Sequence, residues 1–125
     1  MSSGTADDEV LVCLCTCPDP DSARALGRTL VEERLAACVQ LVPGIESIYR
    51  WAGAVETAGE TLLVIKSTRT AFDRLQSRLV ALHSYEVPEL VALPAVAGLP
   101  AYLHWVTDST RAADAGPRDT APATD

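Results

Sequence analysis

Three cysteines share one short apolar segment near the start of the 125-residue chain. Cys13, Cys15 and Cys17 alternate with other residues, so an extended backbone would place all three thiols on one face. Thiolates bind copper and zinc, which makes a thiolate cluster one hypothesis. Regular strand spacing of about 6.6 Å is too wide for one tetrahedral ion, unless Pro18 turns Cys17 back. Cys38 is expected to pack as a small apolar side chain.

A second group of polar residues lies in the connector after the second predicted helix. Tyr85, Glu86 and Glu89 fall close together there, and Lys66 is the single lysine of the chain. Lys66 has three interpretations: it pairs with one of these glutamates, binds an anion, or is a solvated charge at a strand end. Glu86 and Glu89 are separated by an extended Val-Pro pair, so they are expected to point apart rather than act as an acid and base.

The sequence gives no support for catalysis. It contains no Ser-His-Asp grouping, no phosphate-binding loop and no helical His-x-x-x-His motif. Acylphosphatases share the predicted topology but need an asparagine, and this chain has none. His104 has no evident partner, and Trp51 is more typical of an interface anchor than of a ligand-stacking residue. The chain is therefore predicted not to be an enzyme.

Composition excludes several classes of partner. The formal net charge is -7, whereas nucleic acids and anionic membrane surfaces require a basic face. No apolar run reaches the length of a membrane-spanning helix, and the first residues lack the features of a signal peptide. Without an export signal, the four cysteines are expected to be reduced thiols, and the predicted location is cytoplasmic.

Hydrophobic patterning divides the chain into a body over residues 9–110 and polar tails, expected to be disordered, over 1–8 and 111–125. Asp19-Pro20 predicts the start of the first helix, and Thr70 is the predicted cap of the second. Strands are expected over Glu9–Thr16, Leu35–Trp51 with an interruption at Pro43-Gly44, Val55–Ser67 and Glu89–Pro94; helices are expected from Pro20, after Thr70 with a stripe of Phe72, Leu75, Leu79 and Leu82, and over Ala101–Asp108.

This order predicts an α+β fold, a ferredoxin-like βαββαβ sandwich with a long central hairpin and a short C-terminal helix. Hairpin arms of about 14 residues reach about 45 Å, whereas a helix of that length covers about 21 Å. The apolar outer half of the hairpin must therefore extend beyond its own helices. Such an exposed ribbon favours an obligate oligomer; the alternative is a hairpin that bends back at Pro43-Gly44.

Eight segments in register over residues 10–108 resemble the CutA family, the divalent-cation tolerance proteins. The resemblance implies a ferredoxin-like fold, a tight homotrimer similar to PII signalling trimers, and binding of copper or another divalent cation in metal tolerance. The matching segments are Cys15-Thr-Cys-Pro-Asp, Leu35-Ala-Ala-Cys, Pro43-Gly44, Ser47-Ile-Tyr-Arg-Trp51, Lys66-Ser-Thr, His83-Ser-Tyr-Glu-Val-Pro-Glu89, Leu93-Pro94 and Tyr102-Leu-His-Trp105.

The same resemblance implies metal ligands at Cys15 and His83. Glu89, in the connector after His83, is a further candidate as an oxygen donor. Leu82 stands where bacterial members have the first of two adjacent histidines, and leucine cannot bind a metal. The alternative is a purely structural role, in which Cys15 is a small core residue and His83 is a cap at a helix C-terminus.

The resemblance also places Lys66, Tyr85, Glu89 and Trp105 near a cleft between subunits. Two further functions follow as alternatives to metal tolerance. One is a PII-like sensor that binds a small anionic ligand in that cleft, and the other is a structural trimer with a protein partner.

Overall fold

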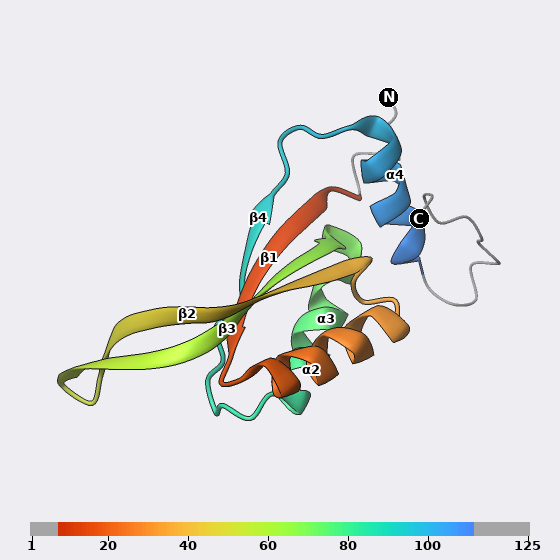
Figure 1. The fold of residues 1–125 in the computed structure, drawn as a ribbon. Helices are drawn as coiled ribbons and strands as arrows, with labels where there is room; N and C mark the ends of the chain where they lie inside the picture. The colour runs from red at the N-terminus through yellow and green to blue at the C-terminus, as the bar shows by residue number, and fades with distance from the viewer. Residues whose placement is uncertain (1–7, 112–125) are drawn as a thin grey trace.

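A computed structural model describes residues 8–111, which form one four-stranded sheet with three helices (Figure 1). The predicted tails over 1–8 and 111–125 lie outside the described residues, apart from one residue at each boundary. The elements are β1 (Val10–Cys17), α2 (Pro20–Glu32), β2 (Cys38–Trp51), β3 (Ala54–Thr68), α3 (Arg69–Leu82), β4 (Val91–Pro94) and α4 (Pro100–Ser109).

The strands lie in the order β2-β3-β1-β4, and every neighbouring pair is antiparallel. β1 and β2 run parallel on either side of β3 and are joined by α2, which is the split βαβ arrangement. The predicted ferredoxin-like α+β sandwich is therefore confirmed. Its central strand β1 is largely buried, as its continuous apolar sequence predicts.

Local sequence explains where the helices begin. Asp19 caps α2 because its side chain accepts a 2.7 Å hydrogen bond from the amide of Ser22, and Pro20 occupies the first helical position. The prediction that Thr70 caps α3 is wrong. Thr68 is the cap, since its backbone is extended and its hydroxyl accepts a hydrogen bond from the Ala71 amide, so β3 leads directly into the helix.

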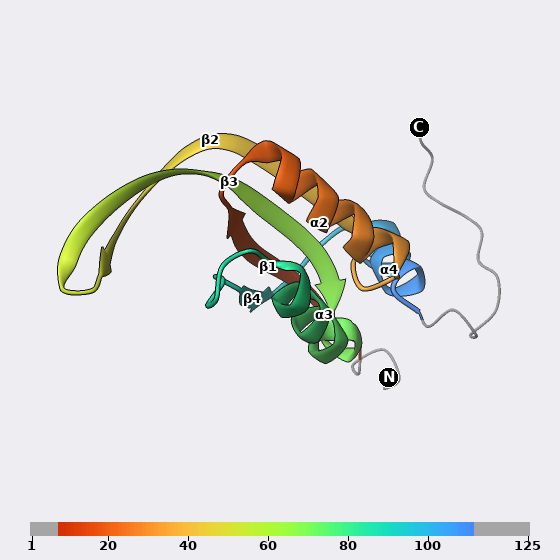
Figure 2. The ribbon, with the colours of Figure 1, turned by 90° about the horizontal axis from the view of Figure 1, so that it is seen from below.

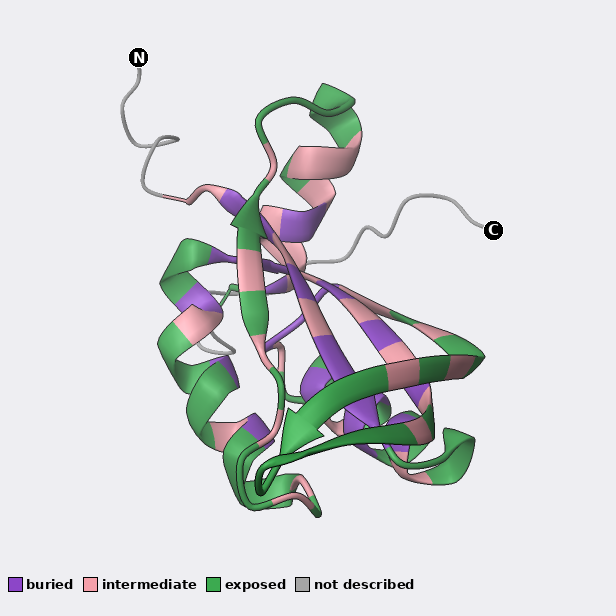
Figure 3. Ribbon diagram, turned by 90° about the vertical axis from the view of Figure 1, so that its left-hand side faces the viewer, coloured by how far each residue is buried: buried purple, intermediate pink, exposed green. Residues whose placement is uncertain are grey.

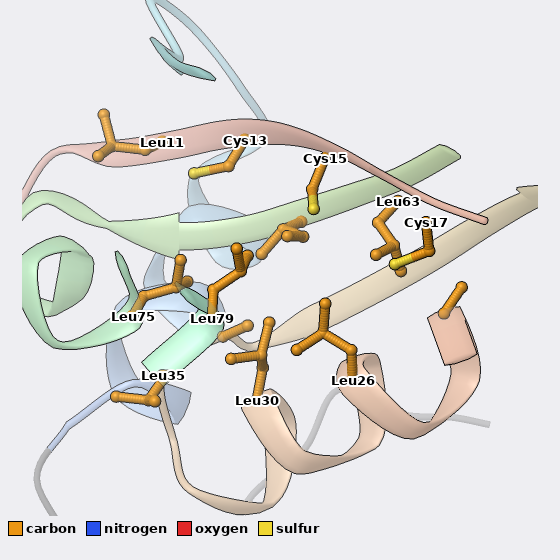
Figure 4. Close-up of a cluster of buried hydrophobic side chains, with 13 residues drawn as sticks. Leu11, Cys13, Cys15, Cys17, Leu26, Leu30, Leu35, Leu63, Leu75 and Leu79 are labelled. Atoms are coloured by element: carbon orange, nitrogen blue, oxygen red, sulfur yellow. The ribbon is translucent and has the colours of Figure 1, made fainter. Parts of the chain in front are cut away.

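The main core lies between the sheet and the helices α2 and α3 (Figure 4). Alternation along β1 turns Leu11 and all three of its cysteines toward these helices. The stripe predicted on α3 is buried only in part, because Leu82 is 41% exposed at the end of the helix. The buried leucines that meet the cysteines are Leu26, Leu30, Leu35, Leu63, Leu75 and Leu79.

The outer half of the β2–β3 hairpin extends beyond the rest of the sheet (Figures 1 and 2). β1 pairs with β3 only up to Thr61, so residues 54–60 pair with β2 alone. Pro43-Gly44 does not break β2: a register shift there accommodates both residues, with Gly44 at φ 78°. The hairpin curves away from the body, and Trp51 at its tip is 64% exposed.

Within residues 8–111, the opposite face of the sheet is covered only at one end. There α4 packs Val106 and Trp105 against Val10, whose side chain points away from the main core. Along β1 and β3 buried residues alternate with half-buried ones, as the banding in Figure 3 shows. The half-buried residues, together with exposed ones on β2 and β4, make up most of the rest of this outer face and are mostly apolar. Its members are Val12, Leu14, Gln40, Val42, Leu62, Val64, Lys66, Val91 and Leu93.

Candidate metal site at the end of the first strand

Two cysteines at the end of β1 lie beside the histidine that follows α3. One ligand atom from each of Cys15, Cys17 and His83 lies within 4.8 Å of the others. Both cysteines are buried, and His83 is half-buried. The thiols approach more closely than backbone spacing suggests, because each sulfur can rotate about its Cα–Cβ bond toward its neighbour. Two sulfurs and an imidazole nitrogen are donors suited to copper or zinc.

Both ring nitrogens of His83 make hydrogen bonds. The Tyr85 amide donates to Nδ1 at 3.0 Å, so this nitrogen bears a lone pair. Nε2 lies 2.8 Å from the carbonyl oxygen of Thr16, which can only accept, so Nε2 bears the proton. The ring is therefore neutral, and its orientation is fixed between β1 and the connector. Its Nε2 also lies 3.7 Å from the sulfur of Cys17.

The three thiols of β1 have different proton affinities. The hydrogen bond between the Cys15 and Cys17 side chains, together with burial, raises the pKa of Cys15. The same hydrogen bond lowers the pKa of Cys17, because the proton of Cys15 stabilises a thiolate there. Burial alone raises the pKa of Cys13 to about 11. Cys17 is thus the thiol of the pair that loses its proton first.

Acidic side chains lie around the pair. The Tyr85 hydroxyl donates a 2.7 Å hydrogen bond to the carboxylate of Glu60. The pKa of Tyr85 is raised, first by burial, then by this hydrogen bond and by the negative charge of Glu60. The charges of Glu60 and Glu89 also help to raise the pKa of Cys15. The carboxylate of Glu89 is exposed to solvent. The negative charges around the cysteine pair favour the binding of a cation over an anion at the end of β1.

Comparison with known proteins identifies the family and the fold. Residues 11–109 match the family described as CutA1 divalent ion tolerance protein. The chain belongs to the CutA1 family. It is 52% identical over 99 residues to a divalent-cation tolerance protein CutA from Thermus thermophilus, covering 79% of this chain and 96% of that protein. A chloroplastic CutA from Arabidopsis thaliana is 43% identical over 81% of this chain, but only 56% of its own length is matched.

Solved CutA1 structures agree with the architecture. The Thermus thermophilus protein superposes with a TM-score of 0.80 at 50% identity, covering 82% of this chain and 99% of that one. CutA1 from Oryza sativa gives a TM-score of 0.80 at 43% identity, covering 82% and 94%. Family members are named as tolerance proteins for divalent cations. Separately, no helix within residues 8–111 is long and apolar enough to cross a membrane.

The other residues predicted from the CutA resemblance do not meet in one chain. Tyr85 lies near Cys17 at one end of β1, whereas Trp105 packs with Val10 at the other end, about 23 Å away along the strand. Lys66 lies on the outer face and donates a 2.8 Å hydrogen bond to Gln40, rather than to a glutamate of the connector. A cleft that unites these residues requires more than one subunit.

Two residues near this CutA1 cluster were not predicted as part of it. Regular strand spacing makes Cys17 too distant for a shared ion unless Pro18 turns it back, because backbone spacing does not show how the sulfurs rotate. Glu60 stands in the hairpin, and the pairing of Cys17 with Thr61 places it one step beyond the end of β1. A strand register assigned from the sequence would have brought Glu60 to this site.

Proposed function

We propose that this CutA1 protein is a cytoplasmic homotrimer that binds copper or another divalent cation and acts in metal tolerance without catalysis. The observation that supports it is the cluster of Cys15, Cys17 and His83. Thiolate and imidazole are the donors that borderline and soft metals prefer, and the acidic surroundings favour a cation. The family name supports a role with divalent cations in general.

Cys15 and His83 are the proposed ligands, with the exposed Glu89 as an oxygen donor. Binding through Nε2 of His83 has a definite cost. The ring must transfer its proton to Nδ1, so the hydrogen bonds with Thr16 and the Tyr85 amide are both lost. This cost favours moderate rather than very tight binding, as expected of a protein that exchanges its ion.

The trimer is proposed from surfaces that one chain leaves uncovered. The outer sheet face has an apolar centre of Leu14, Leu62 and Val64, each half-buried in a single subunit. The hairpin tip exposes Ile48 and Trp51 to 70% and 64%. Large exposed apolar surfaces and free strand edges are normally covered by another chain. Lys66 and Trp105 lie on or beside this outer face, where a neighbouring subunit would bring Tyr85 toward them.

The experiment is an anaerobic calorimetric titration of the full chain with copper and with zinc. Replacing Cys15 by Ser is expected to lower the affinity at least about tenfold, because a direct ligand is lost. Cys38→Ser is the matched control, since Cys38 is a half-buried thiol outside the cluster. Unchanged stoichiometry and affinity in Cys15→Ser would disprove the ligand assignment. Light scattering on the same sample measures the trimer.

A further inference from the structure

We infer that Cys17 is a metal ligand together with Cys15 and His83, and that the ion held by this set is monovalent copper. The inference rests on the proposed function, because it adds a ligand and names an ion for the same site. Cys17 belongs to the buried core at the end of β1, and its sulfur also lies 3.7 Å from Nε2 of His83.

The distance between Cys17 and His83 matches that between two ligands of one ion. A sulfur at about 2.3 Å and a nitrogen at about 2.05 Å from a metal are about 3.6–3.8 Å apart when the bond angle lies between tetrahedral and trigonal. The sulfur of Cys17 is 3.7 Å from Nε2 of His83. The third donor, Cys15, lies within 4.8 Å of both. All three donors would meet at one ion after the Cys15 side chain rotates and the His83 ring leaves the carbonyl of Thr16.

The number and type of donors select the ion. Structural zinc needs four protein ligands, and iron–sulfur clusters usually need four cysteines. Within residues 8–111 the buried part of the site supplies two thiols and one imidazole. The exposed Glu89 would add a hard oxygen donor, which suits a divalent ion and adds little for a soft one. Cys15 and Cys17 are 0% and 2% exposed, which leaves little access for water as a fourth ligand. Monovalent copper is soft and favours thiolates, so it fits this set best.

Binding is a ligand exchange that needs no oxidant or reductant, since copper enters in the monovalent state. Two S–H bonds of Cys15 and Cys17 are replaced by two Cu–S bonds, and both protons pass to solvent. The Nε2 proton of His83 moves to Nδ1, and Nε2 donates its electron pair to copper. His83 is the half-buried member of the set, so the ion reaches the two thiols from its side.

X-ray absorption at the copper edge, on the full chain loaded anaerobically with one equivalent of monovalent copper, tests the ligand set. The wild type is expected to show two sulfur neighbours, and Cys17→Ser to show one. Competition with a coloured chelator of monovalent copper is expected to show at least an about tenfold lower affinity for Cys17→Ser. Cys13→Ser is the matched control, because Cys13 is buried on the same strand face outside the cluster.

The outcomes separate this inference from the proposed function. A single sulfur neighbour in the wild type would overturn the role of Cys17, and that measurement requires no substitution. So would an affinity for monovalent copper that is equal in Cys17→Ser and wild type. If divalent ions still bind through Cys15 in either case, the proposed function stands. If the wild type binds neither monovalent copper nor divalent ions, both fail.

Discussion

The imidazole Nε2 of His83 lies 2.8 Å from the carbonyl oxygen of Thr16, the residue between the two cysteines of the cluster. This hydrogen bond connects the end of α3 to the end of β1, across 67 positions of sequence. On its other side, Nδ1 of the same ring accepts a hydrogen bond from the Tyr85 amide. His83 therefore fixes the connector to the strand while the ring is metal-free, and a bound ion must compete with both contacts.

Metal binding is expected to free the amide of Tyr85. A neutral imidazole bound to metal through Nε2 has its proton on Nδ1, which can no longer accept the Tyr85 N–H. Amide hydrogen exchange of Tyr85 should therefore become faster when monovalent copper is added, as measured by NMR. The His83 amide, which donates to Leu79 within the last helical turn, is the internal control and should keep its protection. Equal exchange at Tyr85 with and without copper would show that His83 does not bind the ion.

Because Cys13 is buried, the free energy of unfolding is expected to fall as the pH becomes alkaline. Its pKa is about 11 in the folded chain against 9.0 for a free thiol, so the folded state holds the proton more tightly than the unfolded state. This contribution is fully present below pH 9 and is lost as the pH rises toward 11. The loss should reach about 2–3 kcal/mol in the free energy of unfolding.

Urea unfolding at several pH values between these limits measures this loss. Cys13→Ala serves as the comparison, because other buried groups titrate in the same range. The variant should be less stable at neutral pH, since it leaves a small cavity among the core leucines. Its stability should nevertheless fall less steeply with pH than that of the wild type. Parallel curves for the two proteins would contradict the predicted contribution of Cys13.

A charge on the outer sheet face should dissociate the proposed trimer. Val64 is half-buried in one subunit, at the centre of this face, so Val64→Glu would place a carboxylate in the subunit interface. Light scattering at micromolar concentration should then give the mass of a single chain. Val80→Glu, a matched change on α3 where the side chain is 49% exposed, should leave the trimer intact. A trimer that survives Val64→Glu would place the interface elsewhere.

The hairpin turn contains a strained residue that can be improved. Ala52 and Gly53 have φ values of 52° and 84°, which is a type I′ turn, and alanine is poorly suited to positive φ. Replacing Ala52 by Asn should stabilise the protein by about 0.5–1 kcal/mol, because asparagine tolerates this conformation. Ala52→Val should have the opposite effect. Thermal unfolding at equal protein concentration compares them, and a lower melting temperature for Ala52→Asn would contradict the prediction.

Local sequence was sufficient for most of the elements. The continuous apolar segment of β1 and the Asp19-Pro20 start of α2 each specify structure through a few adjacent residues. The cap of α3 is not specified in this way, because Thr68 and Thr70 both stand at suitable positions. The sequence alone does not reveal that β3 continues as far as Thr68.

The sequence alone predicted the strand order, the long hairpin and the candidate ligands Cys15 and His83. Periodicity, turn residues and family motifs are all patterns of residues that lie close together in the chain. The tertiary structure decided which donors meet. Cys17 joined them because side-chain rotation brings its sulfur to the ring of His83, which the end of α3 delivers from 66 positions away. Contacts of that kind depend on packing between distant segments, and no local pattern of residues encodes them.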